Sequence, residues 1–208
     1  MSNQNKKILQ LTELSLLLAL VIVLQWLGSF IKIGPLPMSF VLVPIVVGAC
    51  LLGVKAGAFL GFSFGLVTMI MGIVGLDEFS HMLWEVNPFW FIVVCLLKAT
   101  LAGFGSGLIY KALDKLFKGK NKTLTTVIAS VSAPIINTGV FCLGMLLFFF
   151  DTAGSLTGAL GQPTAIKVIF LGLAGFNFLG EFTVNLILSP AIVRIIEVVG
   201  KKMKLGKN

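Results

Sequence analysis

Charged residues are scarce in this chain. Only 12% of its 208 residues are Asp, Glu, Lys or Arg, whereas 57% are hydrophobic, and the mean hydropathy is +1.04. This composition argues against a soluble domain and indicates an integral membrane protein. The first apolar run does not end in an A-x-A cleavage site, so we expect a retained helix there rather than a signal peptide.

Residues that carry enzyme chemistry are also few. His81 is the one histidine, and the three cysteines stand in separate apolar runs without C-x-x-C spacing, which argues against disulfide and metal frameworks. The sequence has no G-x-S-x-G elbow, no P-loop and no closely spaced, paired carboxylates on a membrane helix. We therefore predict that the chain is not an enzyme, has no catalytic residues, cofactor or metal, and cannot use ATP by itself.

Long apolar segments make up most of the chain. A membrane-spanning helix needs roughly 20 mostly apolar residues, and short polar or Gly/Pro-rich breaks separate such runs. We predict an all-α integral membrane protein with six transmembrane helices that form a single membrane domain over residues 1–208. The predicted segments are residues 11–30, 38–54, 56–75, 88–111, 123–150 and 164–198.

The net charge of +8 comes from basic residues at the ends of these segments rather than on a polar face, so we expect no nucleic acid as a partner. The four basic connections fall on one side of a six-span chain, and the positive-inside rule makes that side cytoplasmic. Both termini are then predicted to be cytoplasmic in a multi-pass cell-membrane protein surrounded by lipid. The basic connections hold Lys6 and Lys7, Lys55, Lys111 to Lys122, and Lys201 to Lys207.

Two ionisable side chains are predicted near the middle of the membrane, where a Lys or Asp costs roughly 2.5 to 3.5 kcal/mol. At 1.5 Å per residue, Lys98 lies about 15 Å beyond the start of the fourth segment, and Glu181 lies about 20 Å above the cytoplasmic end of the sixth. Asn177, Glu181 and Asn185 follow at four-residue intervals and share one helix face. We expect this face to line a polar ligand cavity with Lys98 as its cationic anchor. The alternative is a structural Lys98–Glu181 ion pair, with the asparagines bonding neighbouring helices.

Three further side chains are candidate ligand contacts, each with a structural alternative. Asn137 follows Pro134 and could instead satisfy the carbonyl group that the proline leaves free. Asn87 precedes Pro88, an arrangement typical of a helix start. Trp84 lies near the predicted outer boundary, where an interfacial aromatic residue is expected.

Glycines recur at four-residue spacing in the third segment, which indicates a face for close helix packing. This stripe consists of Gly53, Gly57, Gly61 and Gly65, and the fourth segment repeats the pattern with Gly103 and Gly107. We interpret it as an internal packing face.

The chain resembles the substrate-binding S components of energy-coupling factor (ECF) transporters over nearly its whole length. The resemblance rests on six helices, cytoplasmic termini, and the stretches "PMSFVLVPIVVGACLLGVKAGAFLGFSFGL" and "NPFWFIVVCLLKATLAGFGSGLIYKAL". It implies that the protein captures a vitamin from outside and joins a transmembrane coupling protein and two ATPases, which drive its toppling in the membrane. The family's A-x-x-x-A motif for coupling-protein contact corresponds here to Ser15 and Ala19 in "LSLLLAL".

The sequence looks most like the pantothenate-type branch of this family. One Lys, one Glu and several amides suit a small carboxylate that also bears hydroxyl and amide groups, as pantothenate does. The alternatives are an S component for another vitamin, such as folate, riboflavin or a corrinoid, and a self-contained secondary transporter in which Lys98 and Glu181 relay protons.

Overall fold

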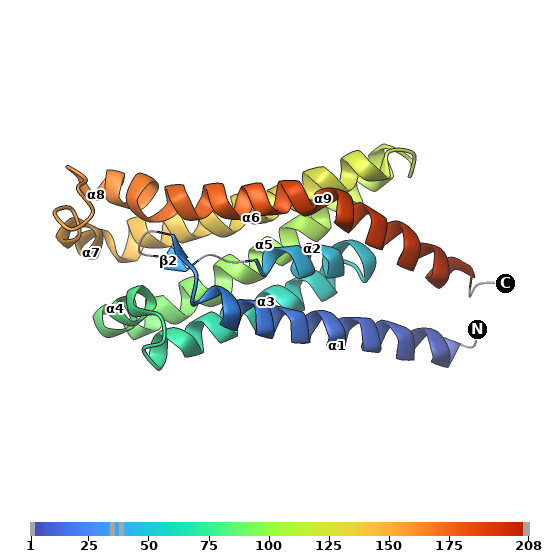
Figure 1. Ribbon diagram of the computed structural model, residues 1–208, viewed down its shortest axis with the longest axis horizontal. Coiled ribbons are helices and arrows are strands. Elements are labelled where there is room, and N and C mark those ends of the chain that lie inside the picture. Colours follow the sequence, from blue (N-terminus) through green and yellow to red (C-terminus); the bar gives the residue numbers. More distant parts are fainter. Residues whose placement is uncertain (1–2, 34–35, 38–39, 206–208) are drawn as a thin grey trace.

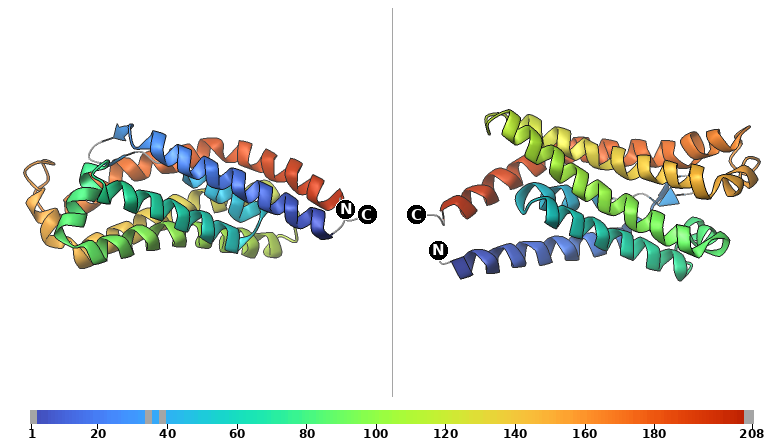
Figure 2. Two further views of the ribbon diagram at one scale, coloured as in Figure 1. Left: turned by 90° about the horizontal axis from the view of Figure 1, so that it is seen from below. Right: turned by 180° about the vertical axis from the view of Figure 1, so that it is seen from behind.

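A computed structural model describes residues 3–33, 36–37 and 40–205 as an elongated bundle of helices (Figure 1). The long helices run roughly along the bundle, and both ends of the chain lie at the same end of it (Figure 2). Its main helices are α1 (Asn3–Gly28), α2 (Leu42–Leu51), α3 (Val54–Ile73), α5 (Pro88–Leu116), α6 (Lys122–Phe148) and α9 (Ala174–Leu205).

Within the described residues, five helical stretches are long and apolar enough to cross a membrane. The predicted segment 38–54 is the exception, because α2 has only 10 residues and is therefore about 15 Å long, half of the roughly 30 Å hydrocarbon layer. Its apolar composition reflects burial in protein, since Leu42, Ile45 and Val46 are fully buried. Gly53, with φ of 99°, lies between α2 and α3, two residues before the break predicted at residue 55.

Short elements that the sequence reading did not predict occupy the end of the bundle opposite the termini. They are β1 (Lys32–Ile33) paired antiparallel with β2 (Leu36–Pro37), α4 (Glu78–Val86), α7 (Phe150–Ser155), α8 (Ala165–Lys167) and the π-helical turn η1 (Val168–Leu173). Figure 1 shows these elements grouped at this end, which we call the capped end. The regular structure of the described residues is thus helical apart from one pair of two-residue strands.

Gly57, Gly61 and Gly65 of the predicted stripe pack directly on α5, which confirms an internal packing face for these three, whereas nothing lies within 4 Å of a Cβ at Gly53. A Cβ at Gly57 would lie 2.5 Å from the Gly103 carbonyl oxygen, and one at Gly65 would lie 2.6 Å from the Cys95 carbonyl oxygen. A Cβ at Gly61 would collide with the Ala99 carbonyl group. The two backbones therefore touch, and this contact fixes α5 against α3 along the turns that flank residue 98.

The buried apolar side chains of the described residues form two clusters. One gathers around α4, α5, α6 and η1 and includes Phe91, Met145 and Ile169. The other joins α1, α2, α3 and α9 and includes Leu60 and Ile192. Both clusters contribute to the wall of one cavity, with Phe91 and Phe141 from the first and Phe64 from the second.

Candidate functional site

A small cavity of about 60 Å³ lies inside the bundle. Side chains from α1, α3, α4, α5, α6 and α9 line it, so it sits where most of the long helices meet. Four of the predicted site residues, Lys98, Asn137, Asn177 and Glu181, are among these side chains. The polar residues that line the cavity are Gln25, Thr68, Asp77, Ser80, Lys98, Asn137, Thr138, Asn177 and Glu181.

The Glu181 side chain is held by amide groups from two helices. Asn137 Nδ2 on α6 donates to Glu181 Oε2, and Asn177 Nδ2 on α9 donates to Oε1, each at 3.3 Å. Asn185 Nδ2 donates to the Glu181 backbone oxygen at 2.9 Å. Asn137 therefore directs its amide to Glu181 rather than to a carbonyl group freed by Pro134. With only 1% of its surface exposed, Glu181 is fixed in orientation on the cavity wall.

Lys98 faces the same cavity from α5 and is not paired with Glu181. Its Nζ atom lies 5.2 Å from the centroid of the Phe141 ring, and it forms no ion pair with any described carboxylate. A cation–π contact stabilises an ammonium group by roughly 0.5 to 2 kcal/mol, less than the cost of placing a lysine at membrane depth. Because Lys98 forms no ion pair with Glu181, the structure does not contain the direct Lys98–Glu181 pair of the structural alternative.

Several oxygen atoms of the cavity wall have no hydrogen-bond partner among the described residues. They are Asp77 Oδ1, Asn137 Oδ1, Thr138 Oγ1 and Asn177 Oδ1, and all four residues line the cavity. A buried polar atom left unsatisfied costs about 1 to 3 kcal/mol, so four of them around one cavity require an explanation. The cavity thus presents one unpaired cation and a set of unpaired hydrogen-bond acceptors.

Three predicted contacts lie outside this cavity. Asn87 is the N-cap of α5, where its side chain accepts a hydrogen bond from the Trp90 backbone N–H at 3.3 Å. Trp84 packs edge-on against Phe91 with ring centroids 6.2 Å apart. Asn185 lies one turn beyond Glu181 and bonds only its backbone. The geometry of Asn87 matches its helix-start alternative.

The predicted coupling-protein residues lie on the surface of α1. Ser15 and Ala19 are both exposed, as are the neighbouring Leu16 and Leu20. Near the other end of the same helix, Gln25 points inward and donates through Nε2 to Thr68 Oγ1 on α3 at 3.2 Å.

The sequence reading missed several residues of the cavity wall. Gln25 is the one amide within the first apolar segment, and this isolation is a signal that could have identified it. Asp77 and Ser80 fall between the predicted segments 56–75 and 88–111, where no sequence pattern predicted α4. The aromatic residues of the wall carry no pattern that separates them from core residues; they are Phe64, Phe79, Phe91, Phe141 and Phe149.

A larger groove of about 620 Å³ runs between α6 and the η1–α9 segment, but no charged residue lines it. Leu143, Phe170 and Phe178 are among its side chains, as is typical of a surface that faces hydrocarbon. Thr138 and Ala174 line both this groove and the cavity, so only a thin wall separates the two. The groove lacks the polar groups that a water-soluble ligand would need.

Comparison with known proteins assigns the chain to a family. Residues 9–193 match the family described as "ECF transporter, substrate-specific component". The chain is 26% identical to the pantothenic acid transporter PanT of Lactococcus lactis subsp. cremoris, with 86% of this chain and 89% of that protein covered. It is 24% identical to the pantothenate transporter PanT of Leuconostoc mesenteroides, with 86% and 81% covered. The chain therefore belongs to the substrate-specific components of ECF transporters, and it is a multi-pass transport protein of the cell membrane rather than an enzyme.

Proposed function

We propose that this chain captures pantothenate from outside the cell, with Lys98 as the anchor for the ligand's carboxylate. The observation that carries the proposal is the unpaired Lys98 ammonium group on a cavity wall whose other polar groups are mostly acceptors. Pantothenate has one carboxylate to accept from Lys98, and an amide N–H and two hydroxyl groups to donate. The names of both PanT relatives support the same ligand.

The apolar part of the wall suits the rest of such a ligand. Pantothenate carries two methyl groups on a quaternary carbon, and the phenylalanine rings around the cavity offer an apolar surface for them. We assign the amide oxygens of Asn137 and Asn177 to the donor groups of the ligand, since both are unpartnered and lie beside Glu181. Asn185, Asn87 and Trp84 then act from behind the site, by holding Glu181 and the start of α5.

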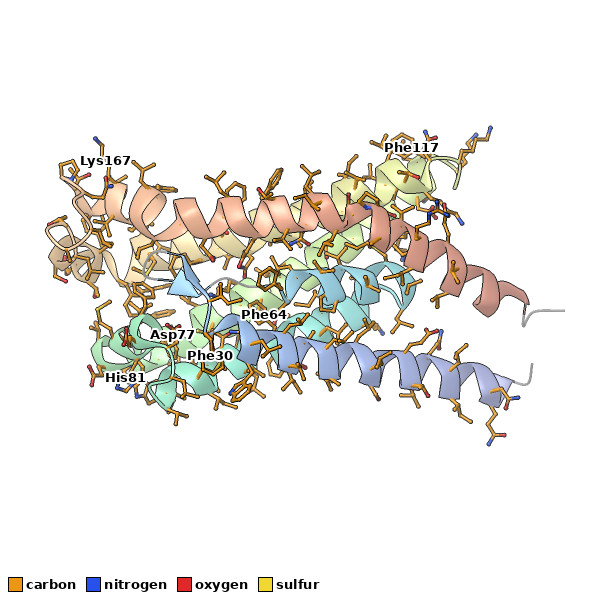
Figure 3. The ribbon with its side chains drawn as sticks, viewed as in Figure 1. Phe30, Phe64, Asp77, His81, Phe117 and Lys167 are labelled. Carbon is orange, nitrogen blue, oxygen red and sulfur yellow. The ribbon has the colours of Figure 1, made fainter. Side chains whose placement is uncertain are left out.

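The cavity must widen when such a ligand binds. Its volume of about 60 Å³ is well below the roughly 300 to 1,000 Å³ typical of small-molecule sites. The elements that can move most simply are those of the capped end, because α4 is short and joins the long helices through turns. Figure 3 labels Asp77 and His81 at this end, far from Phe117 at the other.

For the complete transporter, we propose six membrane segments in one domain, with α2 as the short second segment and both termini cytoplasmic. The lysine-rich connection after α5 lies at the same end as the termini (Figures 1 and 3), which supports this orientation. The capped end then faces outward and receives the vitamin. Delivery requires a transmembrane coupling protein and two ATPases, and the exposed Ser15 and Ala19 are the proposed contact with the coupling protein.

Calorimetry on the purified chain tests the ligand. We expect pantothenate to bind and folate, riboflavin and a corrinoid not to bind; tighter binding of any of these would overturn the pantothenate assignment. Reconstitution into liposomes tests the mode of transport. Accumulation of pantothenate by this chain alone under an ion gradient, without ATPases, would instead support a secondary transporter.

A further inference from the structure

Asp77 is a second carboxylate on the cavity wall, and nothing in the proposed function uses it. Asp77 lies in the turn between α3 and α4, and only 5% of its surface is exposed. Its Oδ2 atom accepts a hydrogen bond from the Ser80 hydroxyl group. Its Oδ1 atom has no partner among the described residues, although the residue lines the cavity.

A structural role as a helix cap does not explain this carboxylate. Asp77 occupies the N-cap position of α4, where an Asp side chain usually accepts a hydrogen bond from a backbone N–H of the first turn. No such bond is present at Asp77. Its backbone oxygen accepts from the His81 N–H at 2.8 Å, and its side chain meets the first turn of α4 only through the Ser80 hydroxyl group. The carboxylate is instead directed to Ser80 and the cavity.

The other charged groups of the cavity make Asp77 the better acceptor for a ligand. Both oxygens of Glu181 already accept from asparagine amides, whereas Asp77 keeps one oxygen free of any described donor. The Lys98 ammonium group belongs to the same wall but forms no ion pair with Asp77. A ligand that spans the cavity therefore meets the Lys98 ammonium group on α5 and, at the capped end, the Asp77 carboxylate with one oxygen still available as an acceptor.

We propose that Asp77 is a specificity-determining residue that accepts a hydrogen bond from a hydroxyl group of the ligand, at the end of the ligand remote from its carboxylate. This inference rests on the proposed function. Hydrogen bonds to an ionised acceptor are about twice as strong as neutral ones, and a site built for a hydroxyl group rejects analogues that lack it. Ser80 positions the carboxylate, and because Ser80 belongs to α4, the same bond ties the ligand to the capped end.

The test compares two ligands on four proteins by calorimetry of the full chain in detergent. The ligands are pantothenate and N-(3,3-dimethylbutanoyl)-β-alanine, which keeps the carboxylate, amide and methyl groups but lacks both hydroxyls. The proteins are the wild type, Asp77→Ala, Asp77→Asn and the matched control Glu85→Gln. Glu85 is an exposed carboxylate at the other end of α4, so its substitution removes one negative charge from the same element without touching the cavity.

We expect Asp77→Ala to weaken pantothenate binding roughly 10- to 100-fold, the loss of one charge-assisted hydrogen bond. The affinity for the hydroxyl-free analogue should change by less than about threefold. The preference for pantothenate over the analogue should therefore be largely lost. Asp77→Asn, which keeps the shape of the side chain and one acceptor, should give an intermediate ratio. Glu85→Gln should leave both affinities unchanged.

A purely structural role of Asp77 predicts a different result, because damage to α4 would weaken both ligands by the same factor. The inference is overturned if the wild type binds pantothenate and Asp77→Asn shows the same ratio of affinities for pantothenate and the analogue as the wild type. This holds even if Asp77→Ala fails to fold. If the wild type does not bind pantothenate at all, the proposed function fails first, and the two failures are thereby distinguished.

Discussion

Substitution of Lys98 by Met should abolish ligand binding and stabilise the ligand-free protein at the same time. The methionine side chain is similar in length and packs well against an aromatic ring, so the contact with Phe141 is kept while the charge is removed. A ligand carboxylate buried without its partner costs about 3 to 5 kcal/mol, which corresponds to roughly a hundredfold to a few thousandfold weaker binding.

The gain in stability follows from the same charge. Insertion of a lysine near the centre of a membrane helix costs roughly 2.5 to 3.5 kcal/mol, and the cation–π contact offsets about 0.5 to 2 kcal/mol of this. Removal of the ammonium group should therefore stabilise the unliganded chain by about 0.5 to 3 kcal/mol, seen as a higher unfolding temperature.

Calorimetry and thermal unfolding of the same detergent-solubilised samples measure the two effects together. The matched control is Lys111→Met, on the exposed surface toward the other end of α5, which should alter neither property. A Lys98→Met protein that binds pantothenate normally would refute the role of Lys98 as anchor. A loss of both binding and stability would instead mean that Lys98 supports the fold.

Three further substitutions test other parts of the molecule. Glu181→Gln should weaken binding about tenfold in calorimetry, because a glutamine amide nitrogen cannot accept from an asparagine amide; unchanged affinity would show that the carboxylate does not shape the site. Gly61→Val should reduce the free energy of unfolding by more than about 1 kcal/mol, measured as a lower unfolding temperature, because its side chain would collide with the Ala99 carbonyl group. The control Gly139→Ala, with nothing within 4 Å of the new Cβ, should leave the unfolding temperature unchanged. Ser15→Trp should preserve binding but reduce ATP-driven uptake in proteoliposomes with the complete transporter; normal uptake would remove α1 from the proposed contact.

The polar face of the last helix could be predicted because its signal is local. Four-residue spacing in an apolar run is enough to place Asn177 and Glu181 on one face, and the structure puts both on the cavity wall. The glycine stripe was predictable for the same reason. What spacing could not give was the partner of each group, and the structure directs the amides to Glu181 while Lys98 meets an aromatic ring.

The parts that sequence reasoning missed depend on contacts between distant segments. Asp77 looks like any acidic residue of an outer connection until α4 folds back and buries it. The length of α2 was overestimated because an apolar run looks the same whether lipid or protein surrounds it, and only the packing of the other helices distinguishes the two. The cap of Asn87 on α5 was a local pattern, and it was one of the stated alternatives for that residue.

The backbone contact between α3 and α5 also limits how this protein can adapt to different vitamins. Two helices that touch through glycines cannot separate or slide without losing contacts that lipid does not replace. The α5 wall of the cavity therefore keeps its position relative to α3. Any increase in the size of the ligand must be absorbed by the opposite wall, where the Asn137 side chain on α6 bonds Glu181 on α9, and by α4, whose Ser80 side chain bonds Asp77 in the preceding turn. We therefore expect changes of ligand among related transporters to appear on α4, α6 and α9, while the glycine contact remains the same.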